Sequence, residues 1–174
     1  FSFTTQALPG DCGIGTTPNV LYQYGFESGV VGWTHSGTGD SWAIASANPH
    51  AGTSHFRATD PAVVSDQRLV SPAVVVPTGQ NPVVLKFWNF QTLEDSTATT
   101  CWDGGIVEVS TDGGTTWTQV PAANLLAGPY TGAVNATFGN PLAGLPASCG
   151  ATSYIQTIAD VSARPVGELR GWLR

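Results

Sequence analysis

Glycine and proline recur throughout this chain of 174 residues, and they limit the length of any regular element. The chain holds 21 glycines and 12 prolines, and the runs between them are short and rich in β-branched and aromatic residues. No run carries an apolar repeat of about 3.6 residues over the length of a helix. Short strand-like runs separated by turn residues are typical of all-β sandwiches and barrels. The sequence therefore predicts an all-β fold.

The predicted strands lie between the turn signals. The tail ELRGWLR has the start of a helical pattern, but Gly171 interrupts it and Pro165 precedes it. The first 19 residues are rich in Gly, Pro and Thr without a period, so we expect an arm or linker over 1–19 and one domain over 20–174. The strand-like runs cover residues 41–46, 66–77, 81–90, 105–111, 115–121 and 152–162.

The charge balance excludes two classes of partner. Six basic residues stand against twelve acidic ones, which gives a net charge of −6. Such a chain lacks the cations that neutralise a phosphate backbone, so we expect no nucleic-acid partner and no binding to anionic membranes. No apolar run approaches the length of a membrane span. Three cysteines allow one disulfide and one unpaired thiol, which together with the sparse charge predicts a secreted, extracellular protein.

The stretch CWDGGIVEVSTDGGTTW, residues 101–117, holds two Asp-Gly-Gly turns around an alternating apolar segment. The second turn, at Asp112, lies between two strand-like runs, and its glycines supply the positive φ that a hairpin needs. The segment from Ser110 to Trp117 matches the Asp-box pattern S-x-D-x-G-x-T-W of sialidase-like propellers. A single copy, in a chain with five arginines, predicts a structural hairpin rather than a sialidase site.

The chain contains, in this order, the stretches YGFESGVVGWTHSGTGDSWAIA, DQRLVSPAVVV, VVLKFWNFQTLE, CWDGGIVEVSTDGGTTWTQV, YTG…NPLAG…SCG and ADVS. Together they resemble the MAM-like jelly-roll domains of bacterial secreted peptidases and adhesins. The resemblance covers residues 20–174 and implies a jelly-roll β-sandwich of two antiparallel sheets. Members of that family continue with an Asp-rich loop and a final strand, whereas this chain stops at Arg174. We therefore expect the last strand to be missing, and a neighbouring domain, another polypeptide or a clipped segment to complete the fold after Arg174.

The resemblance also implies a structural calcium ion near the start of the domain. Glu27 matches the family's Phe-Glu and Asp103 its Asp-Gly-Gly, with Asp66 and Glu94 as neighbouring ligands. A calcium ion takes six or more oxygen ligands, so these carboxylates would have to converge from distant loops. The alternative is that Asp103 caps its own turn and Glu27 lies on the surface.

A disulfide is implied in the same way. Cys101 and Cys149 correspond to the paired positions of the family, and a bond between them would close a loop of about fifty residues. Cys12, on the arm, is then left over.

Six tryptophans raise the alternative of a carbohydrate-binding module, because exposed rings can stack on sugars. The alternation around Trp42 and Trp88 predicts that both pack in the core, and Trp117 belongs to the hairpin. Trp33 and Trp102, which lie beside Gly-rich loops, are therefore the candidate ligand-binding rings.

Motifs of catalysis are sparse. His50 and His55 lack a third zinc ligand, and the zincin motif H-E-x-x-H is absent. Glu108 and Asp112 resemble part of the strand motif of some β-sandwich glucanases, but its third acid is missing. We therefore predict no catalytic residue.

The predicted function is that of a calcium-stabilised accessory domain of a secreted protein, and we expect that larger protein to be a peptidase. The domain would bind a protein or polysaccharide surface, or support a neighbouring catalytic domain. The first alternative is a carbohydrate-binding module, and a glycan-active hydrolase is the second.

Overall fold

The computed structural model describes residues 10–163 and 168–173, and its regular structure is nearly all β-strand, which confirms the predicted fold class. Each predicted strand-like run contains strand, and the one helical segment of the described residues is a 3-10 turn at Ala122–Asn124. Residues 1–9 of the predicted arm and Arg174 lie outside the described residues. The strands are β1 Thr34–Thr38, β2 Ala43–Ala45, β3 His55–Arg57, β4 Asp66–Val70, β5 Val74–Val75, β6 Val84–Thr92, β7 Asp95–Thr97, β8 Thr100–Cys101, β9 Val107–Ser110, β10 Thr118–Gln119, β11 Leu125–Ala127, β12 Gly132–Val134, β13 Pro146–Ala147, β14 Ala151–Asp160 and β15 Glu168–Leu173.

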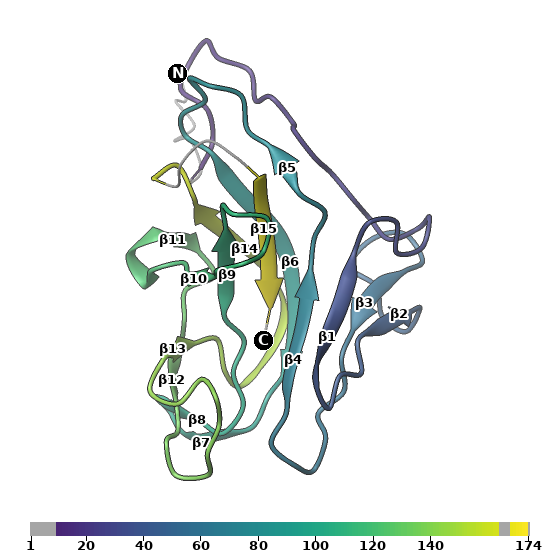
Figure 1. Ribbon diagram of the computed structural model, residues 1–174, viewed down its shortest axis with the longest axis vertical. Helices are drawn as coiled ribbons and strands as arrows, with labels where there is room; N and C mark the ends of the chain where they lie inside the picture. The colour runs from purple at the N-terminus through teal and green to yellow at the C-terminus, as the bar shows by residue number, and fades with distance from the viewer. Residues whose placement is uncertain (1–9, 164–167, 174) are drawn as a thin grey trace, which may run out of the picture.

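Two antiparallel sheets face each other in a sandwich-like arrangement. The larger sheet has the order β1-β4-β15-β9-β10, with β5 paired to β15, and the smaller has the order β11-β14-β6. In Figure 1, β4 and β15 lie in front of β6. Two further groups of strands flank the sandwich: the β2–β3 hairpin, and a sheet of order β13-β12-β8-β7 in which β12 pairs β8 in parallel.

The core between the two large sheets is a cluster of aliphatic side chains. Val107 and Val109 of β9 and Ala159 of β14 are buried in this cluster, so it joins one sheet to the other. Leu85 and Phe87 of β6 pack against it from the smaller sheet. The remaining members are Val83, Val120, Leu125, Tyr130 and Val161.

The C-terminal stretch forms a strand, and its short helical pattern does not give a helix. β15 lies between β4 and β9, where Trp172 pairs with Val70 on one side and with Glu108 on the other. Pairing on both sides satisfies backbone groups that a short helix would leave unpaired at its ends.

The disulfide that the resemblance implies, Cys101–Cys149, is present, with the two Cα atoms 5.7 Å apart. Both cysteines lie in a second buried cluster, together with Ile106 and Ala147, which are both fully buried. Because β8 ends at Cys101 and β14 begins two residues after Cys149, the bond ties the small four-stranded sheet to the sandwich.

The predicted hairpin at Asp112 connects β9 to β10. The Asp112 carboxylate accepts hydrogen bonds from the Ser110 hydroxyl (2.7 Å) and from the backbone N–H and hydroxyl of Thr116 (2.9 and 2.6 Å). Gly113 and Gly114 have φ values of +73° and +87°, which only glycine adopts without strain. These bonds, that of the Thr116 hydroxyl above all, hold the pKa of Asp112 down to about 2, from an ordinary value of 3.8.

We expect the double substitution Cys101→Ser, Cys149→Ser to lower the free energy of unfolding by about 4 kcal/mol, because the bond closes a loop with a sequence separation of 48. Urea unfolding followed by tryptophan fluorescence measures this loss. Cys12→Ser is the control, because Cys12 is a free cysteine. A double variant that unfolds at the same urea midpoint as the control would contradict the expectation.

We also expect Asp112→Asn to lower Tm at neutral pH but not near pH 2. A carboxylate whose folded pKa lies below its unfolded pKa stabilises the fold fully above the unfolded value, and this contribution disappears as the pH falls through the folded pKa. The difference in Tm between Asp112→Asn and the unmodified chain should therefore shrink between about pH 4 and pH 2. A difference that stays constant across this window would show that the Asp112 charge has no such role.

Candidate functional site

Glu27, the first predicted calcium ligand, anchors a loop. Its Oε1 atom accepts hydrogen bonds from the backbone N–H groups of Thr53 and Ser54, both at 2.9 Å, and its Oε2 atom accepts one from the Thr53 hydroxyl at 2.5 Å. These bonds, the hydroxyl bond first, lower the pKa of Glu27 below its ordinary value. Glu27 thus holds the β2–β3 connection against the segment that precedes β1.

The structure brings two of the other predicted ligands together. The backbone N–H of Asp103 donates to the Glu94 carbonyl oxygen at 3.1 Å, and the Glu94 N–H lies 3.4 Å from Asp103 Oδ2. Burial, followed by repulsion from Asp60 and Glu94, raises the pKa of Asp103. Asp66 lies on β4, where its Oδ2 atom pairs with the Arg68 guanidinium at 2.7 Å.

The four carboxylates do not assemble one calcium centre. In the part of the chain that the structure describes, no three His, Cys, Asp or Glu side chains converge as metal ligands would. Glu27 already accepts three hydrogen bonds, and Asp66 already faces a guanidinium. Calcium binding, and the part of these four carboxylates in it, stays a prediction.

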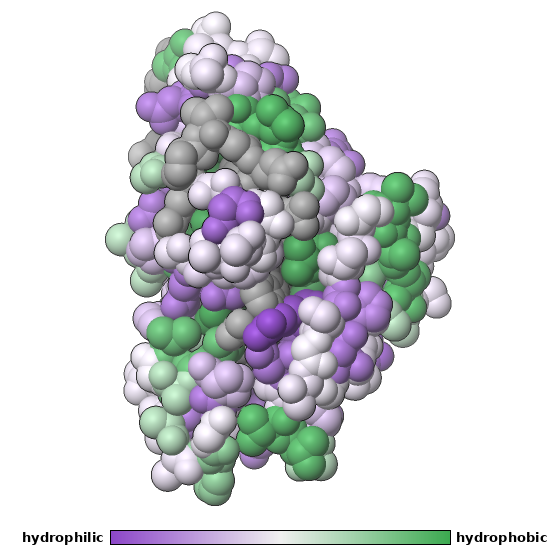
Figure 2. Space-filling view, viewed as in Figure 1, coloured by the Kyte–Doolittle hydropathy of each residue, from purple (hydrophilic) through white to green (hydrophobic). Residues whose placement is uncertain are grey.

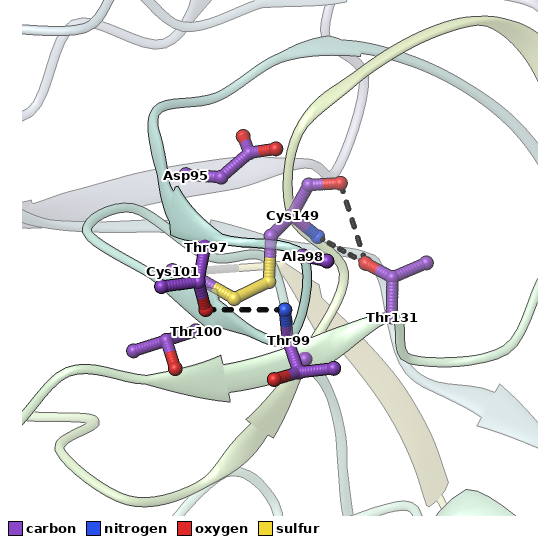
Figure 3. A pocket seen from close by; sticks show the side chains of 9 residues that line it. Asp95, Thr97, Ala98, Thr99, Thr100, Cys101, Thr131 and Cys149 are labelled. Atoms are coloured by element: carbon purple, nitrogen blue, oxygen red, sulfur yellow. Dashed lines mark hydrogen bonds between the residues drawn. A yellow bond between two sulfur atoms is a disulfide. The ribbon is translucent and has the colours of Figure 1, made fainter.

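A shallow hollow lies beside the disulfide (Figure 3). The Thr131 hydroxyl accepts a hydrogen bond from the Cys149 N–H (2.9 Å) and donates to its carbonyl oxygen (3.3 Å), so that it fixes the chain next to the bond. The hollow has a volume of about 80 Å³, whereas pockets for small ligands measure about 300 Å³ or more. We assign it a structural role. Its lining residues are Asp95, Thr97, Ala98, Thr99, Thr100, Cys101, Thr131, Gly132 and Cys149.

Trp33, the first predicted ligand-binding ring, is half-buried within an aromatic cluster. Its ring centroid lies 5.1 Å from that of Phe26 and 6.4 Å from that of Phe56, and its indole N–H donates to the Tyr22 hydroxyl at 3.0 Å. The cluster therefore packs the segment before β1 onto β3. Trp42 belongs to the same cluster through Phe56 and is half-buried.

Trp102, the second predicted ring, is half-buried next to Asp103. Its ring lies 5.2 Å from Phe138, whose side chain is 69% exposed. Trp102 and Phe138 therefore form a small aromatic pair at the surface, apart from any other described ring contact.

A larger group of rings lies on the side of β6 that faces away from the core. Trp88 and Phe90 are 47% and 50% exposed, so the prediction that Trp88 packs in the core is wrong. The His50 ring stacks on Trp88 with a centroid distance of 3.9 Å and an interplanar angle of 15°. Tyr154 of β14 contacts both His50 (5.1 Å) and Phe90 (5.4 Å). We call the four side chains His50, Trp88, Phe90 and Tyr154 the aromatic surface.

The strand alternation of β6 explains why these rings are exposed. Successive side chains of a strand point to opposite faces, so Leu85 and Phe87 in the core place Lys86, Trp88 and Phe90 on the outer face. The run VVLKFWNF carries large apolar residues at both odd and even positions, so its pattern does not predict which face of the strand is buried.

The aromatic surface is bounded by two other segments of the chain. On one side, Gly10 of the arm packs so closely on Ile158 and Val84 that an added Cβ would lie 2.9 Å from Ile158 Cγ2, and Asp11 pairs with Lys86 at 3.2 Å. On the other side lies the β2–β3 connection, which carries His50.

The opposite face of the molecule has a different character. Figure 2 shows the side on which β4 and β15 lie, where hydrophobic residues form separate groups between hydrophilic ones.

The described part of the chain contains no helix with the length and apolar character of a membrane span.

Comparisons with protein-family models, with curated proteins and with solved structures gave no match to this chain. The aromatic surface is therefore interpreted from its own geometry.

Chelation tests the calcium prediction. An ion that binds the folded chain and not the unfolded one stabilises the fold, so excess EDTA should lower Tm and added calcium should restore it. Glu27→Gln and Asp103→Asn then identify the ligands, because a ligand variant should lose the response to calcium. A Tm that neither EDTA nor calcium changes would remove calcium from the description of this protein.

Proposed function

We propose that this chain is a non-catalytic binding module of a secreted protein, with a jelly-roll β-sandwich fold, and that its aromatic surface is the binding site. The observation that carries the proposal is the exposure of Trp88 and Phe90 side by side on one face of β6. Adjacent large apolar side chains on an outer face are typical of interaction sites.

The fixed position of the rings supports a binding role. The Tyr154 hydroxyl donates to the Asn48 carbonyl oxygen at 2.7 Å, and His50 lies stacked on Trp88. Rings held by their neighbours lose little freedom when a ligand binds, which favours affinity.

The environments of Asp112 and Glu108, the two acids that resemble part of a glucanase motif, support a binding module over the hydrolase alternative. A glycosidase needs a carboxyl group with a raised pKa as general acid, next to a second carboxylate across a cleft. Asp112 has a pKa of about 2, and its carboxylate accepts hydrogen bonds within the turn after β9. Glu108, its potential partner, is buried within β9.

The Cys101–Cys149 bond supports secretion, because structural disulfides form and persist in oxidising compartments. The resemblance to accessory domains of secreted peptidases agrees with this placement.

Adsorption of the purified chain tests the proposal. We expect the chain to bind either beads coated with gelatin, fibronectin or casein, or a polysaccharide, tested as pelleted cellulose or chitin and as xylan, glucomannan or amylose in a native gel. The double variant Trp88→Ala, Phe90→Ala should lose this binding, while Phe138→Ala, which removes an exposed ring elsewhere, should keep it. Adsorption to neither class of surface, or equal adsorption of all three proteins, would refute the proposal.

A further inference from the structure

We infer that the ligand of the aromatic surface is a neutral polysaccharide chain; this inference rests on the binding function proposed above. It follows from the spacing of the rings, the charge of their surroundings and the shape of the exposed area.

The two rings lie on one strand, where one extended ligand can contact both. Trp88 and Phe90 are two residues apart on β6, which separates their Cα atoms by roughly 7 Å along the strand. The face of an aromatic ring carries partial negative charge, and the C–H groups on a pyranose face carry partial positive charge. His50 stacks on one face of Trp88, and the part of Trp88 that stays exposed, together with Phe90, offers contacts to one extended chain.

The surroundings of the rings are uncharged or neutralised. On the same outer face, Gln156 of β14 pairs in register with Trp88 and supplies an amide for hydroxyl groups. Lys86 is paired with Asp11 at 3.2 Å, so its charge is compensated. The chain as a whole carries a net charge of −6, which repels uronic-acid polymers. The ligand is therefore a neutral saccharide.

Two other segments of the chain cover parts of this outer face. Arm residues Gly10 and Asp11 cover one side of this sheet face, over Ile158 and Lys86, and the β2–β3 connection contacts the rings from another side through His50. A stable protein interface buries about 800 Å² on each partner, in one continuous patch. The arm at Lys86 and His50 at Trp88 interrupt the outer face of β6 at neighbouring outward positions, which favours an extended chain as ligand over a broad protein surface.

Affinity electrophoresis in native gels that contain xylan, glucomannan or amylose, with pull-down on cellulose and chitin, tests the inference. We expect at least one of these neutral polysaccharides to retain the unmodified chain, and alginate, an anionic polymer, not to. Trp88→Ala and Phe90→Ala should each weaken retention about tenfold, since an aromatic contact contributes on that order. Phe138→Ala should bind like the unmodified chain. Near-UV circular dichroism checks that each variant folds, and the two single variants test the surface independently.

Three results would overturn the inference. Retention by none of the neutral polysaccharides is one, and unchanged retention of both ring variants is another. The third is adsorption to protein-coated beads alone, lost in the ring variants: this would leave the proposed binding function intact and exclude the saccharide. Adsorption to no surface at all would refute both.

Discussion

The alternation of β6 across the core is the constraint on which the rest of the structure depends. Leu85 and Phe87 reach the cluster that contains Val107 and Val109 of β9, and this contact joins the two large sheets. Both side chains are partly buried and their contact with the cluster stabilises the fold, so the register of β6 cannot slip by one residue without exposing them. The same register places the residues between them on the outer face. The candidate binding site is therefore a geometric consequence of how the core is filled.

The other features secure the parts that this core does not reach. The disulfide and the cluster around Ile106 hold the small four-stranded sheet to the start of β14. Rings around Phe56 hold the segment before β1, and Glu27 holds the β2–β3 connection through Thr53. That connection carries His50, so the Glu27 carboxylate fixes the loop that presents one ring of the aromatic surface. The Glu27 hydrogen bonds thus help to position His50, although Glu27 itself is not part of the aromatic surface.

The local features of the chain could be predicted, and they are present. The hairpin at Asp112 forms because its bonds join residues at most four apart in the sequence. The pairing of Cys101 with Cys149 was implied by the resemblance alone, since three cysteines allow more than one pairing. The sequence could not predict whether Glu27, Asp66, Glu94 and Asp103 lie close together. Residues from separate loops meet only if the packing of the sheets brings them together. The packing joins Asp103 to Glu94 and Glu27 to Thr53 of a distant loop, and it leaves Asp66 paired with its neighbour Arg68.

The sequence by itself determined that this protein is built of short strands, because glycine, proline and β-branched residues act on the backbone over a few positions. It also determined the turn after β9, for the same reason. Only the tertiary structure decided which face of β6 is buried and which is exposed. Both faces carry large apolar side chains, and they differ only in that one of them packs against the opposite sheet. For that reason Trp88, expected in the core, lies at the surface, where it stacks with a histidine from a loop 38 positions earlier in the chain.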